Sequence, residues 1–487
     1  MTNELGYLET AARDCPDDIA GEAAGHRYTY GELHRLAEDL QSLLVGNSGQ
    51  RIGVVVPNSL SWISVLSAIW HHDSAAVLFP ASMPMASLTE ATAREGVSTL
   101  ITSSSRAVEL CGSWPGKIVS VDGIVARIEK PQDADQPGGM PAKAGVVLFS
   151  SGTTGIPKAV QVPASAIGAG IGGVLSTTRQ SPRQSSSGGT ARKAHLIAFP
   201  LYHISGLFQL ILAVAMRAPA VVLEKFTVTR FVEALENWPI RQLVLNPPML
   251  SDLVATEDPR VDVLVGRLGL VRSGTAALPV TLRESFCSRF DIPLLQGYGA
   301  TETAGEIAGW SNEDARTHAA TKSSSVGRSK PGVSIVIRDT ADRPVEAGTV
   351  GRVAVRVPWI SHDYQELGDL GYLDDDGFLF IVGRADDVIN CGGFMIHPLV
   401  VEEALNRCSV VAECAVVSEP DERLGEVPVA FVVPREPGPI EDAVEAVARK
   451  HLLPYHRPRR IYVVDRLPRN EMGKVLRRAL RTTDLAS

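Results

Sequence analysis

The sequence lacks the cysteine pattern of a disulfide-bonded or zinc-binding protein. Its 487 residues include six cysteines, and no two have the CxxC spacing of a zinc knuckle or a thioredoxin-like redox pair. The six are Cys15, Cys111, Cys287, Cys391, Cys408 and Cys414. Six thiols in so long a chain are too few for a disulfide scaffold, so we expect buried or chemically idle cysteines in a reducing compartment.

Targeting and membrane signals are also missing. The first residues, MTNELGYLETAARDCPDD, are acidic and contain no apolar run, so no secretory signal is predicted. The most apolar stretch, residues 207–223, is interrupted by Gln209, Arg217 and Pro219 and is too short for a membrane span. These absences predict a soluble, cytoplasmic protein.

The chain has no excess of positive charge. It carries 47 Lys and Arg against 55 Asp and Glu, a formal net charge of −8, which argues against a protein that coats nucleic acid. Hydrophobic residues make up 45% and charged residues 21%, values that exclude wholesale disorder. The length predicts two to four domains.

Short β-rich runs alternate with helical patterns through most of the sequence. RIGVVVPN at residues 51–58 is typical of a buried strand, and the following SWISVLSAIW has apolar residues at helical spacing. The alternation recurs at AAVLFP, STLIT, KIVSVD, AGVVLFSS, HLIAFP and RQLVLNPP. It predicts an α/β protein whose large N-terminal domain, residues 1–384, contains parallel or mixed sheets covered by helices.

Residues 385–487 are predicted to form a small α+β domain. VVEEALNRCS and IEDAVEAVARKHL are helical patterns, whereas AECAVVSEP, VPVAFVVP and RIYVVDRLP are strand patterns. Residues 449–481 carry eleven basic and two acidic side chains, and two interpretations stay open: a solvated surface or a surface that faces an anion. Elsewhere, residues 130–144 resemble a linker, and residues 176–194 a loop that is either disordered or a lid.

The clearest local motif is a glycine- and hydroxyl-rich turn after the strand predicted at residues 145–149. Gly152 and Gly155 allow backbone N–H groups to turn toward a ligand, and Lys158 adds a mobile positive charge. The hydroxyl donors are Ser150, Ser151, Thr153 and Thr154. The spacing is not that of the GxxxxGK[ST] loop. The motif predicts a loop that binds nucleotide phosphates.

With six further motifs, the chain resembles the superfamily of adenylate-forming enzymes that includes acyl-CoA synthetases, peptide-synthetase adenylation domains and firefly luciferase. The further motifs are FPLYHISGL (199–207), VRSGTAALP (271–279), GYGATE (297–302), GDLGYLDDDGFLFIVGR (368–384), GRADDVINCGGFMIHP (383–398) and LPRNEMGKVLRRAL (467–480). They follow the family's order over nearly the whole chain. The chain is therefore identified as a member, in the acyl-CoA synthetase branch.

The resemblance implies an ATP-dependent carboxylic acid–CoA ligase that uses ATP, Mg²⁺ and coenzyme A. Such an enzyme forms an acyl-adenylate, releases pyrophosphate, and then makes a thioester after its small domain rotates. The implied catalytic residues are Lys474, Glu302, Thr301 and His203. Glu302 would bind Mg²⁺, Thr301 would contact the α-phosphate, and Lys474 would bridge the acid's carboxylate and the phosphate.

Further roles in nucleotide and thiol binding follow from the same resemblance. Thr275, Ala276 and Tyr298 are expected around adenine, and Asp369 and Arg384 on the ribose, where an ionised carboxylate suits two hydroxyl donors. The family more often has Gly and Pro at positions 275 and 277. The hinge is expected at Asp386, and Asp374–Gly377 is expected to form a hairpin turn. The expected CoA contacts are Gly392, Gly393, Arg457, Arg459 and Arg460; the two glycines also fit a simple β-turn.

The acyl pocket contains no acidic residue at the start of its helix, in LYHISGLFQLIL, which disfavours a substrate ammonium group. A non-amino hydrophobic acid is therefore expected: fatty, aryl or bulky and terpenoid-like. Its walls are expected to include His203, Phe208, Asn246, Met249, Ser273, Gly297, Gly299 and Gly305. His203 either faces the ligand or is a core histidine. Two alternatives stay open: a carrier-protein pantetheine as the acceptor, and a non-catalytic AMP-binding protein.

Overall fold

The computed structural model describes residues 6–131, 139–150, 158–177, 193–470 and 472–481. The chain divides into two compact units. Unit 1 comprises Met1–Val244, Asp258–Leu270 and Gly299–Gly305, and unit 2 comprises Leu245–Glu257, Val271–Tyr298 and Glu306–Ser487. No disulfide joins the six cysteines. Over the described ranges, no helix is both long and apolar enough to cross a membrane.

Unit 1 contains a seven-stranded sheet in the order β7–β6–β5–β3–β4–β8–β9. Neighbouring strands from β6 to β8 are parallel, and the edge strands β7 and β9 are antiparallel to their neighbours. The strands are β3 (Arg51–Val55), β4 (Ala75–Leu78), β5 (Thr99–Thr102), β6 (Lys117–Asp122), β7 (Val125–Lys130), β8 (Gly145–Ser150) and β9 (Lys158–Pro163). The alternation read from the sequence is thus confirmed here as parallel strands joined through helices.

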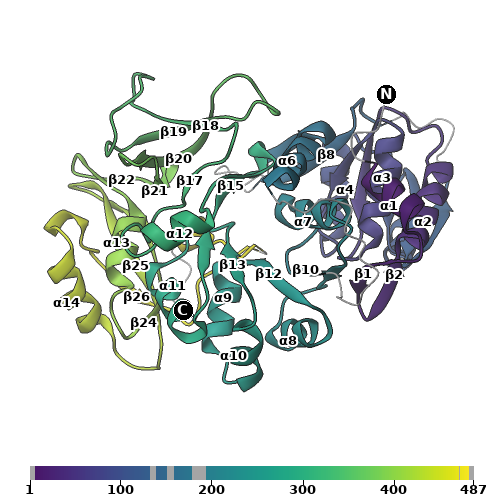
Figure 1. Cartoon of the computed structure of the whole chain (residues 1–487). Coiled ribbons are helices and arrows are strands. Elements are labelled where there is room, and N and C mark those ends of the chain that lie inside the picture. Colours follow the sequence, from purple (N-terminus) through teal and green to yellow (C-terminus); the bar gives the residue numbers. More distant parts are fainter. Residues whose placement is uncertain (1–5, 132–138, 151–157, 178–192, 471, 482–487) are drawn as a thin grey trace. The chain divides into compact units, whose positions relative to one another are not determined.

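A second group of strands in unit 1 has the order β12–β10–β11–β1–β2, with parallel pairs from β12 to β1. The strands are β1 (Ile19–Ala23), β2 (His26–Thr29), β10 (Ala194–Ile197), β11 (Ala220–Val222) and β12 (Ile240–Leu245). The helices of this unit, several of them labelled in Figure 1, are α1 (Tyr7–Asp14), α2 (Tyr30–Leu43), α3 (Ser61–His71), α4 (Met85–Arg94), α5 (Ser104–Cys111), α6 (Ala164–Thr177), α7 (Ile204–Ala215), α8 (Val228–Asn237) and α10 (Pro259–Val265).

The first part of unit 2 mixes a parallel strand pair with antiparallel sheets. Strands β13 and β14 are parallel, β16 and β17 are antiparallel, and β18–β19–β20–β21 form an antiparallel sheet. The elements here are α9 (Pro247–Ala255), β13 (Leu270–Ser273), α11 (Val280–Phe290), β14 (Leu294–Gln296), β16 (Gly305–Gly309), α12 (Asn312–His318), β17 (Arg328–Ser329), β18 (Ser334–Arg338), β19 (Gly351–Arg356), β20 (Gln365–Leu373) and β21 (Leu379–Arg384). Residues 328–384 therefore supply the antiparallel part of a mixed fold.

The predicted DDDG turn is confirmed between β20 and β21. Asp374 accepts hydrogen bonds from the backbone N–H groups of Asp376 and Phe378, at 3.0 and 2.9 Å, and Gly377 has a φ of +76°. Lys322 pairs with both Asp374, at 2.6 Å, and Asp376. This short turn sets the register that brings Asp369 opposite Arg384.

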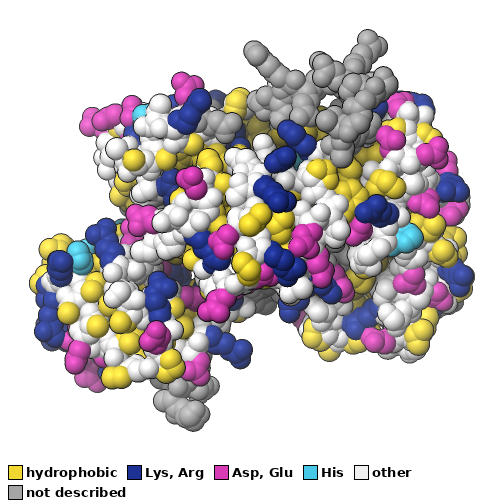
Figure 2. Space-filling view, turned by 60° about the horizontal axis from the view of Figure 1, so that its bottom comes forward, with side chains coloured by type: hydrophobic (Ala, Val, Ile, Leu, Met, Phe, Trp, Pro, Cys, Tyr) yellow, Lys and Arg dark blue, Asp and Glu magenta, His cyan; other side chains and the backbone are white. Residues whose placement is uncertain are grey.

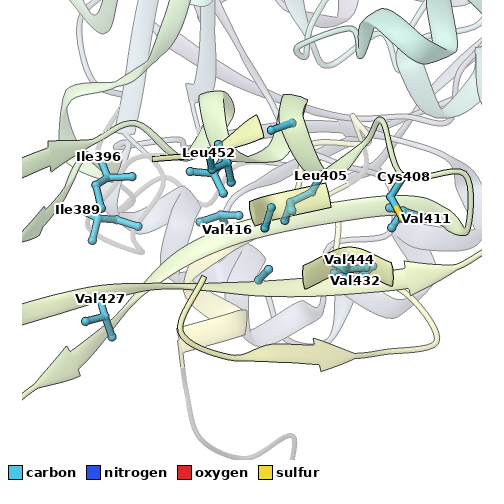
Figure 3. Packing of buried hydrophobic residues seen from close by; sticks show 14 of the residues in the cluster. Ile389, Ile396, Leu405, Cys408, Val411, Val416, Val427, Val432, Val444 and Leu452 are labelled. Atoms are coloured by element: carbon cyan, nitrogen blue, oxygen red, sulfur yellow. The ribbon is translucent and has the colours of Figure 1, made fainter. Parts of the chain in front are cut away.

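The predicted α+β pattern after residue 385 is confirmed in the rest of unit 2. Its elements are β22 (Ile389–Cys391), β23 (Phe394–Ile396), α13 (Pro398–Leu405), β24 (Val411–Asp421), β25 (Gly425–Pro434), α14 (Glu441–His451), β26 (Ile461–Val463) and α15 (Arg477–Arg481). One face of the β24–β25 hairpin packs on α13 and α14, where Val416 and Val432 meet Leu405 and Val444 (Figure 3). Alternate residues of the hairpin, with Phe431 among them, form a second cluster with the chain near Leu467 and Leu480.

Candidate functional site

The predicted phosphate loop connects two strands of a hairpin in unit 1. Strands β8 and β9 are antiparallel, and Ser150 pairs with Lys158 at the end of the ladder. Lys158 is exposed at the start of β9. The connecting residues Ser151, Gly152, Thr153, Thr154 and Gly155 lie outside the described residues. The strand context of the motif is therefore confirmed, and phosphate binding by it stays a prediction.

Thr301 and Glu302 lie in a short 3₁₀ turn, η1 (Thr301–Thr303), that packs against β9 within unit 1. The turn is closed by Thr303, whose hydroxyl accepts a 3.0 Å hydrogen bond from the N–H of Ala300, and by Ala304, with a φ of +57°. Glu302 is half-buried. The described residues contain no cluster of three metal-ligating side chains. One carboxylate nevertheless fits Mg²⁺, which completes its shell with phosphate oxygens and water.

His203 and Phe208 lie at the start of α7. His203 precedes the first helical residue without capping the helix, and burial lowers the pKa of its ring from 6.5 to about 4. The ring is therefore neutral at neutral pH. A Cβ atom at Gly305 would lie 3.8 Å from the ring of Phe208, so these two predicted pocket residues lie together in unit 1.

Asp369, Arg384 and Tyr298 form a compact group in unit 2. The Arg384 guanidinium donates to Asp369 Oδ1 at 3.3 Å and to the Leu367 carbonyl at 2.9 Å. The Tyr298 hydroxyl donates to Asp369 Oδ2 at 2.5 Å. Gly368 has a φ of +78°, and a Cβ there would lie 2.8 Å from Arg384 Nη2. Asp369 thus lies in strand β20 with both carboxylate oxygens already oriented.

The ammonium group of Lys474 is electrostatically coupled to this group. Its pKa is lowered, first by desolvation and then by the positive charge of Arg384, whereas the carboxylates of Asp369 and Asp387 act in the opposite direction. Lys474 as a whole residue is exposed, so the desolvation of its ammonium group is partial. The prediction that Lys474 works next to Asp369 and Arg384 is compatible with this arrangement.

The predicted adenine-binding turn contains a strained backbone position. Thr275 has a φ of +72°, a conformation that β-branched residues seldom adopt because the side chain crowds the backbone. Thr275 is exposed, and Ala276 is half-buried. The strain falls at a position where the resemblance predicts glycine more often than threonine, and glycine adopts this conformation without strain.

The predicted acyl-pocket residues of unit 2 lie near α9 and β13. Asn246 is the N-cap of α9 and accepts from the N–H of Met249 at 3.0 Å, whereas the Gly297 N–H donates to the Ser273 carbonyl at 2.8 Å. The Ser273 hydroxyl is buried and has no hydrogen-bond partner among the residues that the structure describes. Gly299, the remaining predicted wall, belongs to unit 1 and is exposed in β15 (Tyr298–Ala300).

One charged residue beside these walls was not predicted. A Cβ at Gly297 would lie 2.6 Å from the Glu306 carboxyl carbon, so Glu306 fills the space that the glycine leaves. Glu306 pairs with Lys330 at 2.7 Å and lies 3.6 Å from Arg272. Glu306 lies four residues after Glu302 and outside all of the sequence motifs, so no sequence signal indicated that it fills the space beside Gly297.

The two glycines predicted beside the CoA arm form a tight turn. Gly392 and Gly393 connect β22 and β23 with φ values of +58° and +91°, which both require glycine-like freedom. The Gly393 N–H donates to Asn390 Oδ1 at 3.0 Å. The β-turn interpretation is confirmed, and a role in thiol passage stays a prediction.

Two of the three arginines predicted to contact CoA are engaged in structural contacts. Arg457 donates to the carbonyls of Leu452 and Arg449 at the end of α14, at 3.0 and 3.1 Å, and Arg460 pairs with Glu419. Arg459 is exposed. On the face shown in Figure 2, basic and acidic side chains are interspersed. CoA binding by these three arginines therefore stays a prediction.

The comparisons with known proteins agree with this arrangement. The family of AMP-binding enzymes matches residues 8–365, and the C-terminal domain of AMP-binding enzymes matches residues 400–474. A 2–succinylbenzoate–CoA ligase from Bacillus velezensis is 29% identical over 99% of this chain and 98% of its own length. A 4-coumarate–CoA ligase-like protein from Oryza sativa is 31% identical over 69% of this chain and 61% of its own length.

Solved structures give the same result. An o-succinylbenzoate–CoA synthetase from Bacillus subtilis, solved with its acyl-adenylate intermediate, has a TM-score of 0.80 and 25% identity and covers 98% of both chains. The same enzyme in complex with ATP and magnesium has a TM-score of 0.79 and 26% identity, over 98% of this chain and 99% of that one. On the family match, this chain belongs to the AMP-binding enzymes.

Proposed function

We propose that this chain is an ATP-dependent carboxylic acid–CoA ligase. In the first step, a carboxylate oxygen of the acid attacks the α-phosphorus of ATP, which forms an acyl-adenylate and releases pyrophosphate. In the second step, the CoA thiol attacks the acyl carbon, and AMP leaves. Two anions meet in the first step, so catalysis depends on donors and cations held in fixed positions.

The observation that carries the proposal is the group around Asp369. Its carboxylate is held by Tyr298 and Arg384, and the Lys474 ammonium is electrostatically coupled to both Asp369 and Arg384. Asp369 supplies acceptors for ribose hydroxyls, and Lys474 supplies a positive charge for a carboxylate–phosphate pair. A purely structural ion pair between Asp369 and Arg384 would not require a lysine on a tight turn whose charge interacts with both residues.

The metal and the phosphates are assigned to unit 1. Glu302 would hold Mg²⁺, and the metal, when bound, neutralises charge on the phosphate oxygens. Thr301 would donate to the α-phosphate, and Lys158 with residues 150–155 would contact the outer phosphates. Of these residues, Ser150 and Lys158 pair in one hairpin, and the η1 turn packs on its strand β9.

The acid is proposed to be hydrophobic and to have no amino group. No acidic side chain lies at the start of α7, and the neutral His203 offers no counter-charge to an ammonium. The relatives are named for 2-succinylbenzoate and 4-coumarate, which are aryl acids. Aryl acids are therefore the first class to test.

The proposed domain boundary follows residue 384, with Asp386 as the hinge of residues 385–487. CoA is the proposed acceptor, with Gly392, Gly393 and the arginines at 457, 459 and 460 along its path. We also propose a cytoplasmic location, where ATP and CoA are both supplied. An acid panel assayed for pyrophosphate release, and then for CoA thioester by mass, tests the reaction. If a thioester formed only on a carrier protein, that protein and not CoA would be the acceptor.

A further inference from the structure

The catalytic-lysine candidate, Lys474, lies in a turn closed by hydrogen bonds. Asn470 Oδ1 accepts hydrogen bonds from the N–H groups of Met472 and Lys474, at 3.1 and 2.9 Å, and the Asn470 N–H donates to the Lys474 carbonyl at 2.9 Å. Gly473 has a φ of +77°, and its carbonyl accepts from Arg469 at 2.6 Å. We call the described residues of this segment, 470 and 472–474, the lysine turn.

The lysine turn is fixed to the small domain on both sides. Leu467 and Leu480 are buried in the hydrophobic cluster on the β24–β25 hairpin, and Val475 packs against that cluster. Arg477 donates to both carboxylate oxygens of Glu402, at 2.5 and 2.9 Å. The turn therefore moves with the small domain rather than independently of it.

The tip of the lysine turn contacts the start of α9. Asn246 Nδ2 donates to the Met472 carbonyl at 3.0 Å, and both residues are buried, with exposed fractions of 3% and 8%. A Cβ at Gly473 would lie 2.5 Å from Pro248 Cγ, so only glycine allows this approach. The Asn246 amide is oriented in advance, because its Oδ1 caps α9.

Electrostatic attraction between the charged side chains at this contact does not explain it. Asp252 on α9 has a raised pKa, caused by burial and by the negative charge of Glu413 on β24. Two acids thus oppose each other where α9 meets the small domain, although Arg469 pairs with Glu413 at 2.7 Å. The directional contribution to this contact is the hydrogen bond from Asn246 to the Met472 carbonyl.

We propose that Asn246 is a positioning residue that latches the lysine turn onto α9 and so selects the conformer in which Lys474 can act together with Asp369 and Arg384. This inference rests on the proposed function. It gives Asn246 a role different from the pocket wall that the resemblance implied. The latch acts in adenylate formation and is released when the small domain rotates for thioester formation.

The test uses substitutions that separate the latch from the helix cap. Asn246→Ser and Asn246→Asp keep an oxygen that caps α9 but remove the amide donor, whereas Asn246→Ala removes both. For the serine and aspartate variants we expect adenylate formation to fall about fivefold to thirtyfold, the effect of one lost buried hydrogen bond. Thioester formation from presynthesised adenylate should stay at the wild-type value, whereas the melting temperature should fall slightly, because the buried Met472 carbonyl loses its donor. Thr227→Ala, which removes the cap of α8 in unit 1, is the control for cap loss alone.

A second measurement does not depend on activity. In hydrogen exchange, the peptide that covers residues 467–480 should exchange faster in Asn246→Ser than in the wild type. Unchanged exchange, or an equal fall in both half-reactions with a raised KM for the acid, would overturn the latch and favour a pocket wall. Suppose that the wild-type protein releases no pyrophosphate when acids are added, but Asn246→Ser still exchanges faster than the wild type. The latch would then stand, and the ligase function would be rejected.

Discussion

Lys474 is the residue on which the proposed first step depends most. Its ammonium is coupled to Arg384 and Asp369, and it projects from a turn that the Asn470 side chain closes. We expect Lys474→Ala to slow adenylate formation by at least about 10²-fold, as for the loss of one preorganised donor. Thioester formation from presynthesised adenylate should be nearly unchanged. The two half-reactions are measured separately by stopped assays, and an equal fall in both would reject this role.

Thr275 has a backbone conformation that its β-branched side chain disfavours. Its φ of +72° costs roughly 1–2 kcal/mol for a residue with a Cβ, whereas glycine there loses about 0.5–1 kcal/mol in entropy. Thr275→Gly is therefore expected to raise the free energy of unfolding by about 0.5–1 kcal/mol, measured by denaturant titration. Ala277→Gly, in the same exposed turn, is the control and should lower it. A loss of stability in Thr275→Gly would show that its side chain makes a compensating interaction.

At the scale of elements, α15 and α13 are joined by the ion pair between Arg477 and Glu402. Their side chains are 18% and 9% exposed, and Glu402 also accepts from the Val416 N–H at 2.6 Å. Arg477→Met leaves a buried carboxylate without its cation, so we expect a loss of about 3 kcal/mol, seen as a lower melting temperature.

The neighbouring Arg478 supplies the matched control for this prediction. It lies in the same short helix and is exposed, so Arg478→Met should change stability by less than about 0.5 kcal/mol. Equal effects of the two substitutions would mean that the loss of positive charge, rather than the buried pair, is responsible.

The elements themselves were largely predictable, because strand and helix periodicities are local. The parallel strands β3 to β8 and the helices α13 and α14 follow directly from such patterns. The antiparallel sheet of residues 334–384 did not follow from local patterns, because the choice of a strand partner depends on tertiary packing.

The site was predictable where a motif carried it. Asp369 and Arg384 were found from one motif, but the bond from Tyr298 to Asp369 spans 71 residues and left no local signal. Arg477 was one of eleven basic residues in residues 449–481, and its partner lies 75 residues away. The contact between Asn246 and Met472 spans 226 residues. Long-range partners are therefore what the structure adds.

At the scale of the whole molecule, the proposed cycle requires the small domain to change orientation. Asp386 lies in the short turn η2 (Ala385–Asp387) between β21 and β22, where few dihedral angles would have to change. Asp386→Pro fixes one φ angle and removes one N–H group. We expect it to uncouple the half-reactions, so that one rate is retained while the other falls about tenfold or more, the scale of gating by a domain motion.

The control for the hinge is Asp386→Ala, which removes the carboxylate but leaves the backbone free. It should retain both half-reactions within a factor of about two, because the residue is exposed. If the proline variant also retained both rates, the motion would have to occur elsewhere in the chain.

The transfer of a labelled oxygen tests the ligase reaction most directly. An acid labelled with ¹⁸O in its carboxylate is incubated with the full chain, ATP, Mg²⁺ and CoA, and the products are analysed by mass. If a carboxylate oxygen attacks the α-phosphorus and AMP then leaves the acyl carbon, AMP must carry one ¹⁸O for every thioester formed. Unlabelled AMP, or label in inorganic phosphate together with ADP, would contradict adenylate formation by this protein.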